Sequence, residues 1–134
     1  MATSMRNPGK IMQATAEASI ADGVVCIVGT ADYSAAVCGA DPTAGMLGIA
    51  KVDGNGTVAS GSTVDIVTCG IYPAIASATI TQGQTVTVGN SSGHVKPAAP
   101  SAGNNAMILG VALEDASSGE RVAVNVNVSI MQGA

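Results

Sequence analysis

The strongest constraint on the fold of this chain is that its sequence repeats itself. Residues 18–29 align with residues 78–89, with five of the twelve pairs identical. Residues 47–53 align with residues 109–115, with four of the seven pairs identical. Because both matches occur in the same order and at nearly the same spacing, they indicate a duplication rather than chance similarity between small residues.

The duplication divides the sequence into an arm and a domain. We predict two related modules, at about residues 10–69 and 70–128, within one domain that covers residues 10–134. A chain of 134 residues is long enough to bury a stable core as a single domain. Residues 1–9 lie outside the repeat, and we expect them to form an extended N-terminal arm.

Each module is expected to consist of short strands separated by turns. The clearest strand is residues 121–130, where a valine or isoleucine at every second position places one apolar face inward. Its counterpart in the first module is Thr63 to Ile71. Two further strand pairs are expected, namely 24–28 with 85–88 and 47–52 with 108–113.

One segment of the first module has the composition of a helix. Residues 11–20 contain Met, Gln, Ala and Glu, which favour helix formation. The equivalent residues 71–80 contain Pro73 and several β-branched residues, which disfavour it. Because duplicated modules share a fold, we predict that both segments are extended and that the domain is all-β.

Glycine, asparagine and proline mark the connections between strands. Residues 53–56 read Asp-Gly-Asn-Gly and predict a tight turn, with residues 115–119 as its counterpart in the second module. Asp53 and Asp115 are interpreted as turn openers whose side chains accept hydrogen bonds from backbone amides. Residues 39–45 and 96–103 are expected to form surface loops.

Composition argues against nucleic acid and membrane partners. The chain has no Trp or Phe and two Tyr, and its five Lys and Arg against nine Asp and Glu give a net charge of -4. Single-stranded nucleic acid is bound through aromatic platforms and basic grooves, and both are lacking here. No stretch approaches the roughly 20 apolar residues of a membrane span.

The N-terminal residues and the cysteines predict synthesis in a reducing cytosol. Residues 1–12 lack the pattern of a signal peptide. The three cysteines are odd in number, and their spacing fits neither a disulfide framework nor a zinc site. Cys26 is predicted to be a small core residue, whereas Cys38 and Cys69 occupy positions that can be exposed.

Charged residues make up 10% of the chain, against about a quarter in ordinary soluble domains. Neutral surfaces of this kind are often covered by other subunits. We therefore expect a homo-oligomer.

One motif suggests catalysis, but its context does not support this. Residues 89–93 match Gly-x-Ser-x-Gly, which in hydrolases needs a following helix and a distant downstream His. His94 is the one histidine, and it is adjacent to the motif. A hairpin turn with a solvated His94 is therefore predicted. The neighbouring acids Glu114 and Asp115 would point to opposite faces of a strand. No catalytic, cofactor-binding or metal-binding residues are predicted.

Several segments resemble one family of tailed-phage proteins. The segment Val67–Ile71, the strand entry at Ala78–Val86, the passage from Lys96 to Leu109 and the run from Leu109 to Val124 are similar, in this order, to the capsid cement, or decoration, proteins. The resemblance covers roughly residues 10–132. It implies a small β-barrel or β-tulip-like fold, no enzymatic activity and no cofactor.

The resemblance also implies a partner and a location. We expect a structural protein of the virion that binds the outer surface of the assembled capsid, at junctions between major capsid protein subunits, and stabilises it. A trimer is favoured over a dimer. The alternative is a virion-surface module that binds carbohydrate or the host; the near absence of aromatic side chains argues against sugar binding.

The N-terminal arm is the candidate capsid-binding site. Its residues are Arg6, Asn7, Pro8, Gly9 and Lys10. The Asn-Pro-Gly sequence excludes a continuous helix, so the arm alone is expected to be mobile. Its two cations suit acidic groups on the capsid, and its extended backbone suits β-augmentation of a capsid strand.

Overall fold

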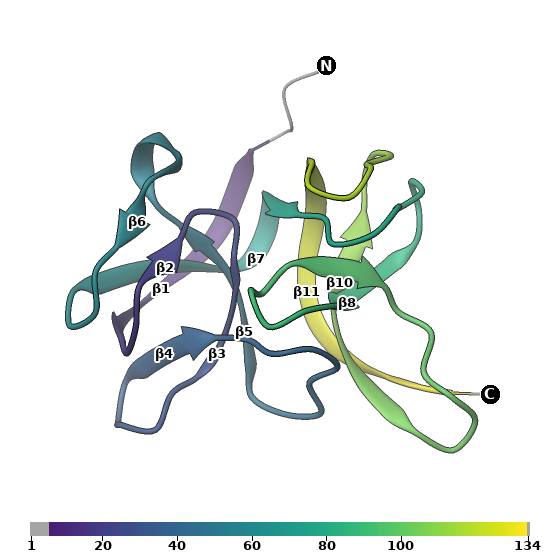
Figure 1. Ribbon diagram of the computed structural model, residues 1–134, viewed down its shortest axis with the longest axis horizontal. Helices are drawn as coiled ribbons and strands as arrows, with labels where there is room; N and C mark the ends of the chain where they lie inside the picture. Colours follow the sequence, from purple (N-terminus) through teal and green to yellow (C-terminus); the bar gives the residue numbers. More distant parts are fainter. Residues whose placement is uncertain (1–5, 134) are drawn as a thin grey trace.

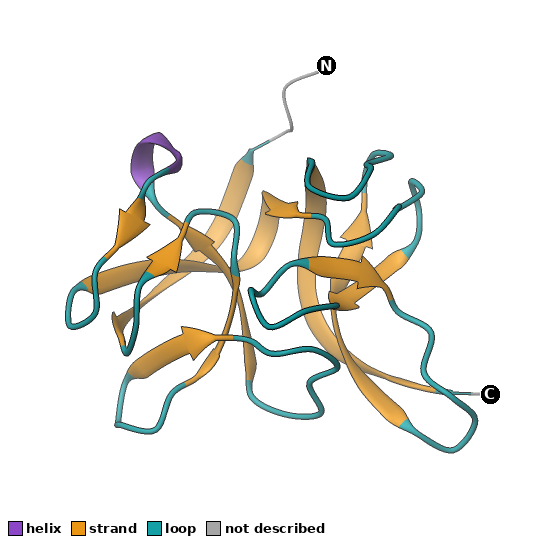
Figure 2. Ribbon diagram, in the orientation of Figure 1, coloured by secondary structure: helices purple, strands orange, loops and turns teal. Residues whose placement is uncertain are grey.

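In the computed structural model, which describes residues 6–133, the chain consists of β-strands, connecting loops and one short 3-10 segment, η1 (Asp53–Asn55) (Figure 2). The all-β fold class predicted from the sequence is confirmed. The strands are β1 (Asn7–Ala16), β2 (Ile20–Ala21), β3 (Val25–Val28), β4 (Ser34–Val37), β5 (Met46–Lys51), β6 (Thr57–Val58), β7 (Thr63–Ile75), β8 (Thr85–Val88), β9 (Val95–Pro97), β10 (Asn105–Ala112) and β11 (Arg121–Gln132).

Strand β7 is shared by two rings of strands, which lie on either side of it (Figure 1). The first ring follows the order β1, β4, β3, β5 and β7, and it closes where β7 pairs with β1. The second ring follows β7, β11, β10, β8 and β9. A parallel bridge between Ala76, just after β7, and Val95 in β9 closes it. The fold is therefore two small barrels joined along one strand.

The strand pairings of the first ring recur in the second. The parallel contact of Ala16 with Ala35 has its counterpart, sixty residues later, in the bridge of Ala76 with Val95. The antiparallel pairs β3–β4, β3–β5, β5–β7 and β1–β7 recur as β8–β9, β8–β10, β10–β11 and β7–β11. The repeated sequence thus folds into a repeated hydrogen-bond pattern.

The repeated Leu-Gly motif has a steric cause. Gly48 in β5 and Gly110 in β10 lie against the carbonyl groups of Val67 and Asn125, in the strands that follow them around each ring. A Cβ atom at either position would collide with that carbonyl oxygen, so glycine is needed where the two backbones approach.

The strands expected from alternation are present, with small changes at their ends. The predicted loop at residues 96–103 is wrong at its start, because Lys96 and Pro97 belong to β9. Proline is tolerated there because it ends a short strand, where no further amide is needed for the ladder. Residues 39–45 form a loop as predicted, and the segments at 11–16 and 71–75 are extended.

Two hydrophobic clusters form the core. One fills the first ring, and the other fills the second ring and also includes residues of the first half. The side chains of the first half that pack into the second cluster are Val25, Cys38, Met46, Ile49 and Val67. The two barrels therefore share a continuous apolar contact.

The three cysteines are free. Cys26 is buried in the first ring, as predicted. Cys38, which was expected at a position that can be exposed, is instead buried, because its side chain lies in the apolar contact between the barrels. Burial raises the pKa of the Cys38 thiol to about 11, and that of Cys26 to about 12. Cys69 is exposed.

Candidate functional site

The residues predicted to form a mobile arm belong instead to strand β1. Asn7 pairs with Ile71, Pro8 with Gly70, and Lys10 with Cys69, all in β7. The prediction failed because the arm was defined by the start of the sequence repeat, near residue 10. The edge of β7 also offers hydrogen-bond partners to the residues before that start, such as Asn7 and Pro8. Residues 1–5 of the predicted arm lie outside the described residues.

Two glycines allow this part of β1 to approach β7. A Cβ atom at Gly70 would collide with the backbone nitrogen of Gly9, and the φ angle of Gly70 is +118°. The register shifts around Gly9, between Pro8 and Lys10, as expected for a bulge. The glycine in the predicted arm therefore serves strand contact rather than mobility.

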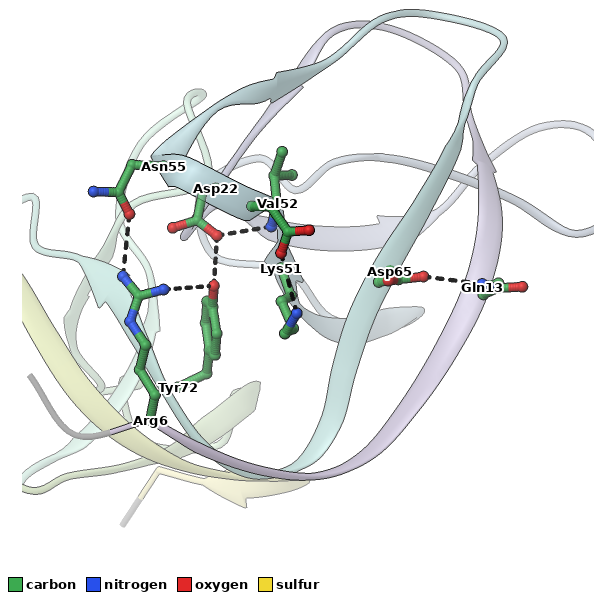
Figure 3. Close-up of polar contacts among 9 residues, drawn as sticks. Arg6, Gln13, Asp22, Lys51, Val52, Asn55, Asp65 and Tyr72 are labelled. Atoms are coloured by element: carbon green, nitrogen blue, oxygen red, sulfur yellow. Dashed lines mark hydrogen bonds and ion pairs between the residues drawn. The ribbon is translucent and has the colours of Figure 1, made fainter.

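Arg6 holds the beginning of β1 against β7 and the η1 turn. Its guanidinium donates hydrogen bonds to the Tyr72 hydroxyl and to Asn55 Oδ1, each with a donor–acceptor distance of 3.1 Å. The same group lies over the Tyr72 ring, with Cζ 5.1 Å from the ring centroid, in cation–π contact. Figure 3 shows the Arg6 side chain between Asn55 and the Tyr72 hydroxyl.

The Tyr72 hydroxyl connects Arg6 to Asp22, which is 1% exposed. Its Oδ1 accepts hydrogen bonds from the Tyr72 hydroxyl at 2.6 Å and from the Val52 amide at 2.8 Å (Figure 3). Its Oδ2 forms an ion pair with Arg121 Nη1 at 2.9 Å. Asp22 and Val52 belong to the first module and Arg121 to the second, so this buried carboxylate connects the two barrels.

The surroundings of Tyr72 change its acidity. Burial, followed by the hydrogen bond to Asp22 and the charge of that carboxylate, raises the pKa of Tyr72 to about 12. The hydroxyl consequently stays protonated and continues to donate to Asp22 at neutral pH. No buried side-chain nitrogen or oxygen within residues 6–133 lacks a hydrogen-bond partner. The cluster of Arg6, Asp22, Tyr72 and Arg121, here called the Asp22 cluster, is thus suited to hold strands together.

Sequence reasoning missed the Asp22 cluster. Asp22 precedes Gly23 at a turn, and such a pair normally indicates an exposed loop. Its equivalent in the second module is Gln82, so the repeat gave no signal of a buried charge. No local pattern signals the cluster, because Tyr72 and Arg121 lie 50 and 99 residues from Asp22 in the sequence.

The Gly-x-Ser-x-Gly segment forms a hairpin turn between β8 and β9, as predicted. Asn90 Oδ1 accepts hydrogen bonds from the amides of Ser92 and His94. His94 is half-buried rather than solvated, because the turn folds back on the first barrel. Burial lowers its pKa.

The two neighbouring acids of the second module bind backbone amides. Glu114 Oε2 accepts a hydrogen bond from the Ala123 amide at 2.8 Å, and Asp115 Oδ1 accepts one from the Gln82 amide at 2.7 Å. Asp115 thus fulfils the predicted role of binding an amide near a turn, although the amide belongs to another loop. Their carboxylates hold loops to strands.

Within residues 6–133, no backbone amide donates a hydrogen bond to the Asp53 carboxylate, so that prediction is wrong. Its side chain is fully exposed and lies 3.5 Å from Lys51 Nζ. The turn at residues 53–56 instead closes through the backbone, with the Gly56 amide donating to the Asp53 carbonyl. The amide just before this turn, that of Val52, donates instead to the Asp22 carboxylate.

Among residues 6–133, no group of three or more His, Cys, Asp or Glu side chains is placed to hold a metal ion. In the same part of the chain, none of the helical segments has the length and apolar character needed to cross a membrane.

Comparisons with known proteins identify relatives of the whole fold. The family model described as "Phage cement protein" matches residues 7–129. A solved structure, the N base of the head fiber gp8.5 of bacteriophage phi29, is similar with a TM-score of 0.63 and 19% sequence identity; the match covers 88% of this chain and 93% of that one. At this identity the similarity concerns the fold. A search of curated proteins found no match.

Proposed function

Because this chain belongs to the family of phage cement proteins, we propose that it binds the outer surface of the assembled capsid at junctions between major capsid protein subunits and stabilises the shell there. That it is a structural protein of the phage capsid follows from the family itself. The observation that carries the proposal is the family match, which spans both barrels and the start of β1.

The fold suits a protein that acts by being rigid. Both barrels close on themselves, they share a strand, and the Asp22 cluster ties them together through a buried, fully paired charge. A preorganised binder loses little conformational entropy on association. Binding to the assembled lattice but not to free capsid subunits would stabilise the lattice by mass action.

Oligomerisation would strengthen this effect. We propose a homo-oligomer, with a trimer preferred over a dimer, since a chain with 10% charged residues presents a neutral surface. Several linked copies would bind the lattice with avidity beyond that of one copy.

The beginning of β1 is proposed as one capsid contact. Asn7, Gly9 and Lys10 are exposed, although their backbone is paired with β7. Among the described residues, Lys10 forms no ion pair within the protein, so its ammonium is available to an acidic group on the shell. Arg6 is less available because it is engaged with Tyr72 and Asn55.

Sedimentation with purified particles that lack this protein tests the proposal. The wild-type protein is expected to co-sediment with expanded shells and to raise the temperature at which they release their contents. Lys10→Glu should weaken binding, whereas Lys51→Glu, with the same charge change on an exposed ion pair elsewhere, should not. Deleting residues 2–9 is unsuitable because it would remove paired residues of β1.

The alternative of a carbohydrate- or host-binding module predicts a different result. In that case, the protein would bind a glycan array or host cells with higher affinity than it binds the shell. Failure of the wild-type protein to bind shells would contradict the proposed function directly.

A further inference from the structure

Tyr33 lies in an unusual backbone conformation with its ring in solvent. It belongs to the loop of residues 29–33, between β3 and β4, and its φ angle is +58°. Its side chain is 88% exposed. A bulky residue in this left-handed region is uncommon and strained, and no burial of its own ring offsets that strain.

The second barrel shows what this position requires structurally. The equivalent loop is residues 89–94, and the residue sixty positions after Tyr33 is Gly93, with a φ angle of +74°. Both loops close with equivalent backbone hydrogen bonds. The Gly29 amide donates to the Ser34 carbonyl at 3.0 Å, and the Gly89 amide donates to the His94 carbonyl at 2.7 Å. The turn therefore suits glycine, and the first barrel carries a tyrosine in its place.

The loop that carries Tyr33 is held by a carboxylate. Glu17 Oε2 accepts hydrogen bonds from the amides of Thr30 and Ala31, at 2.7 and 2.9 Å, and from two hydroxyls. The hydroxyls are those of Thr30, at 2.9 Å, and Ser34, at 2.7 Å. In the second barrel, Glu17 is replaced by Ser77, whose hydroxyl donates to the Val95 carbonyl. The Glu17 contacts thus accompany the tyrosine and not the glycine.

The backbone of Tyr33 is fixed as well, since its carbonyl accepts a hydrogen bond from the Thr15 amide of β1 at 2.9 Å. Val28, which is 55% exposed, lies on the same hairpin, and Asp32 is exposed beside Tyr33. A backbone fixed by hydrogen bonds thus presents a projecting aromatic side chain next to Asp32, on a hairpin that also exposes Val28.

Resting on the proposed function, we propose that Tyr33 is an anchor that inserts into an apolar pocket of the capsid shell, with a basic group at the pocket rim facing Asp32. Tyrosine is enriched among the residues that dominate protein interfaces, because it combines a large apolar ring with a hydroxyl. A projecting side chain suits a pocket in a protein partner, whereas small-molecule and sugar sites are typically concave.

This contact would be separate from the one proposed at the beginning of β1. The β3–β4 hairpin lies at the opposite end of β1 (Figure 1). From Asn7 to Thr15 the strand advances roughly 26 Å, at about 3.3 Å per residue. Two contacts this far apart fit a protein that spans a boundary between capsid subunits.

Substitution of Tyr33 distinguishes a role in capsid binding from a role in the stability of the fold. Tyr33→Gly and Tyr33→Asn both suit a positive φ angle, so both variants should fold and melt at or above the wild-type temperature. Measured by co-sedimentation at limiting protein, both are expected to bind shells at least tenfold more weakly than wild type. Tyr33→Phe should retain most of the binding. Ile130→Ala, which removes another exposed apolar side chain, is the matched control.

Other outcomes would overturn the proposal. If wild-type protein binds shells and Tyr33→Gly binds equally well, Tyr33 is not an anchor, while the proposed function stands. If Tyr33→Gly changes the sedimentation coefficient of the free protein, the partner of Tyr33 is a second copy of this chain. If Tyr33 is needed for signals on a glycan array instead, the ring binds sugar. If wild-type protein does not bind shells, both proposals fail.

Discussion

Asp22 is the residue on which the contact between the barrels depends most directly. Its carboxylate accepts hydrogen bonds from Val52 in the first module and from Tyr72 in the shared strand β7, and it forms an ion pair with Arg121 in the second module. A buried charge with all of its partners present is tolerated, whereas removal of one partner leaves the others unpaired in a medium of low polarity. We therefore expect the contacts of Asp22 to favour one relative placement of the barrels.

We predict that Asp22→Ala lowers the free energy of unfolding by about 3–5 kcal/mol, because Arg121, the Tyr72 hydroxyl and the Val52 amide all lose their acceptor. Urea denaturation measures this change. Asp53→Ala removes a fully exposed carboxylate and should change stability by less than about 0.5 kcal/mol. Equal effects of the two substitutions would contradict the role assigned to Asp22.

Glu17 gives a prediction for pH dependence at the residue scale. Hydrogen bonds from the Ala31 amide, from the hydroxyls of Ser34 and Thr30 and from the Thr30 amide lower its pKa to about 2. Because the pKa in the folded state lies below the unfolded value of about 4.5, the ionised form is favoured on folding. This stabilisation is present above pH 4.5 and is lost as the pH falls toward 2.

Accordingly, hydrogen exchange at the Thr30 and Ala31 amides should accelerate, relative to the rest of the protein, below about pH 4. Glu17→Gln should accelerate the same amides at neutral pH. Asp32→Asn, a neutralisation within the same loop, serves as the control. Unchanged protection of these amides in Glu17→Gln would show that the carboxylate does not hold the loop.

At the scale of elements, β7 pairs with different strands along its length. Residues Thr63 to Val67 pair with β1 and β5, whereas Ile71 to Ile75 pair with β11 on one edge and, at Ile71, with β1 on the other. Gly70 lies at the transition, where an added Cβ atom would collide with the backbone of Gly9 in β1. This glycine is therefore required by the packing of two backbones rather than by a turn.

We predict that Gly70→Ala lowers the free energy of unfolding by at least about 2 kcal/mol more than Gly61→Ala. Both glycines have positive φ angles, but a Cβ atom at Gly61 meets no atom, whereas at Gly70 it meets the backbone of Gly9. In Gly70→Ala the start of β1 should detach and become sensitive to protease. Comparable stabilities of the two variants would contradict this account.

Elements with a clear repeat or alternation could be predicted from the sequence, and those fixed by distant contacts could not. The alternating valines predicted β11, and the duplication correctly overrode the helical composition of residues 11–20. The pairing of Asn7 and Pro8 with β7 was missed because their partners, Ile71 and Gly70, are distant in the sequence. Asp22 was missed for the same reason, since Tyr72 and Arg121 reach it only after both barrels form.

The whole molecule is expected to unfold as one unit, although its sequence is a tandem repeat. The barrels share β7, and one hydrophobic cluster includes side chains from both. Neither half can therefore lose its structure without exposing apolar surface of the other.

Calorimetry should accordingly show a single transition, with a calorimetric enthalpy equal to the van't Hoff enthalpy. Val64→Ala and Val122→Ala remove equivalent buried side chains, one in each barrel, and each should shift that single transition, at a cost of about 2–3 kcal/mol. Two resolved transitions, or a shift of only one part of the curve, would show that the barrels unfold independently.

Closure of the two rings also bears on how this protein avoids aggregation. An open sheet presents unpaired amides and carbonyls that can recruit further chains, and many proteins protect such edges with lysines or other charges. This chain has five Lys and Arg in 134 residues, so it has little charge to use in that way. The first barrel closes where β7 pairs with β1, and the second closes where the residue after β7 pairs with β9. The sheet therefore has few edges to protect. Geometry here replaces the electrostatic repulsion that other sheet proteins use to prevent polymerisation at high local concentration.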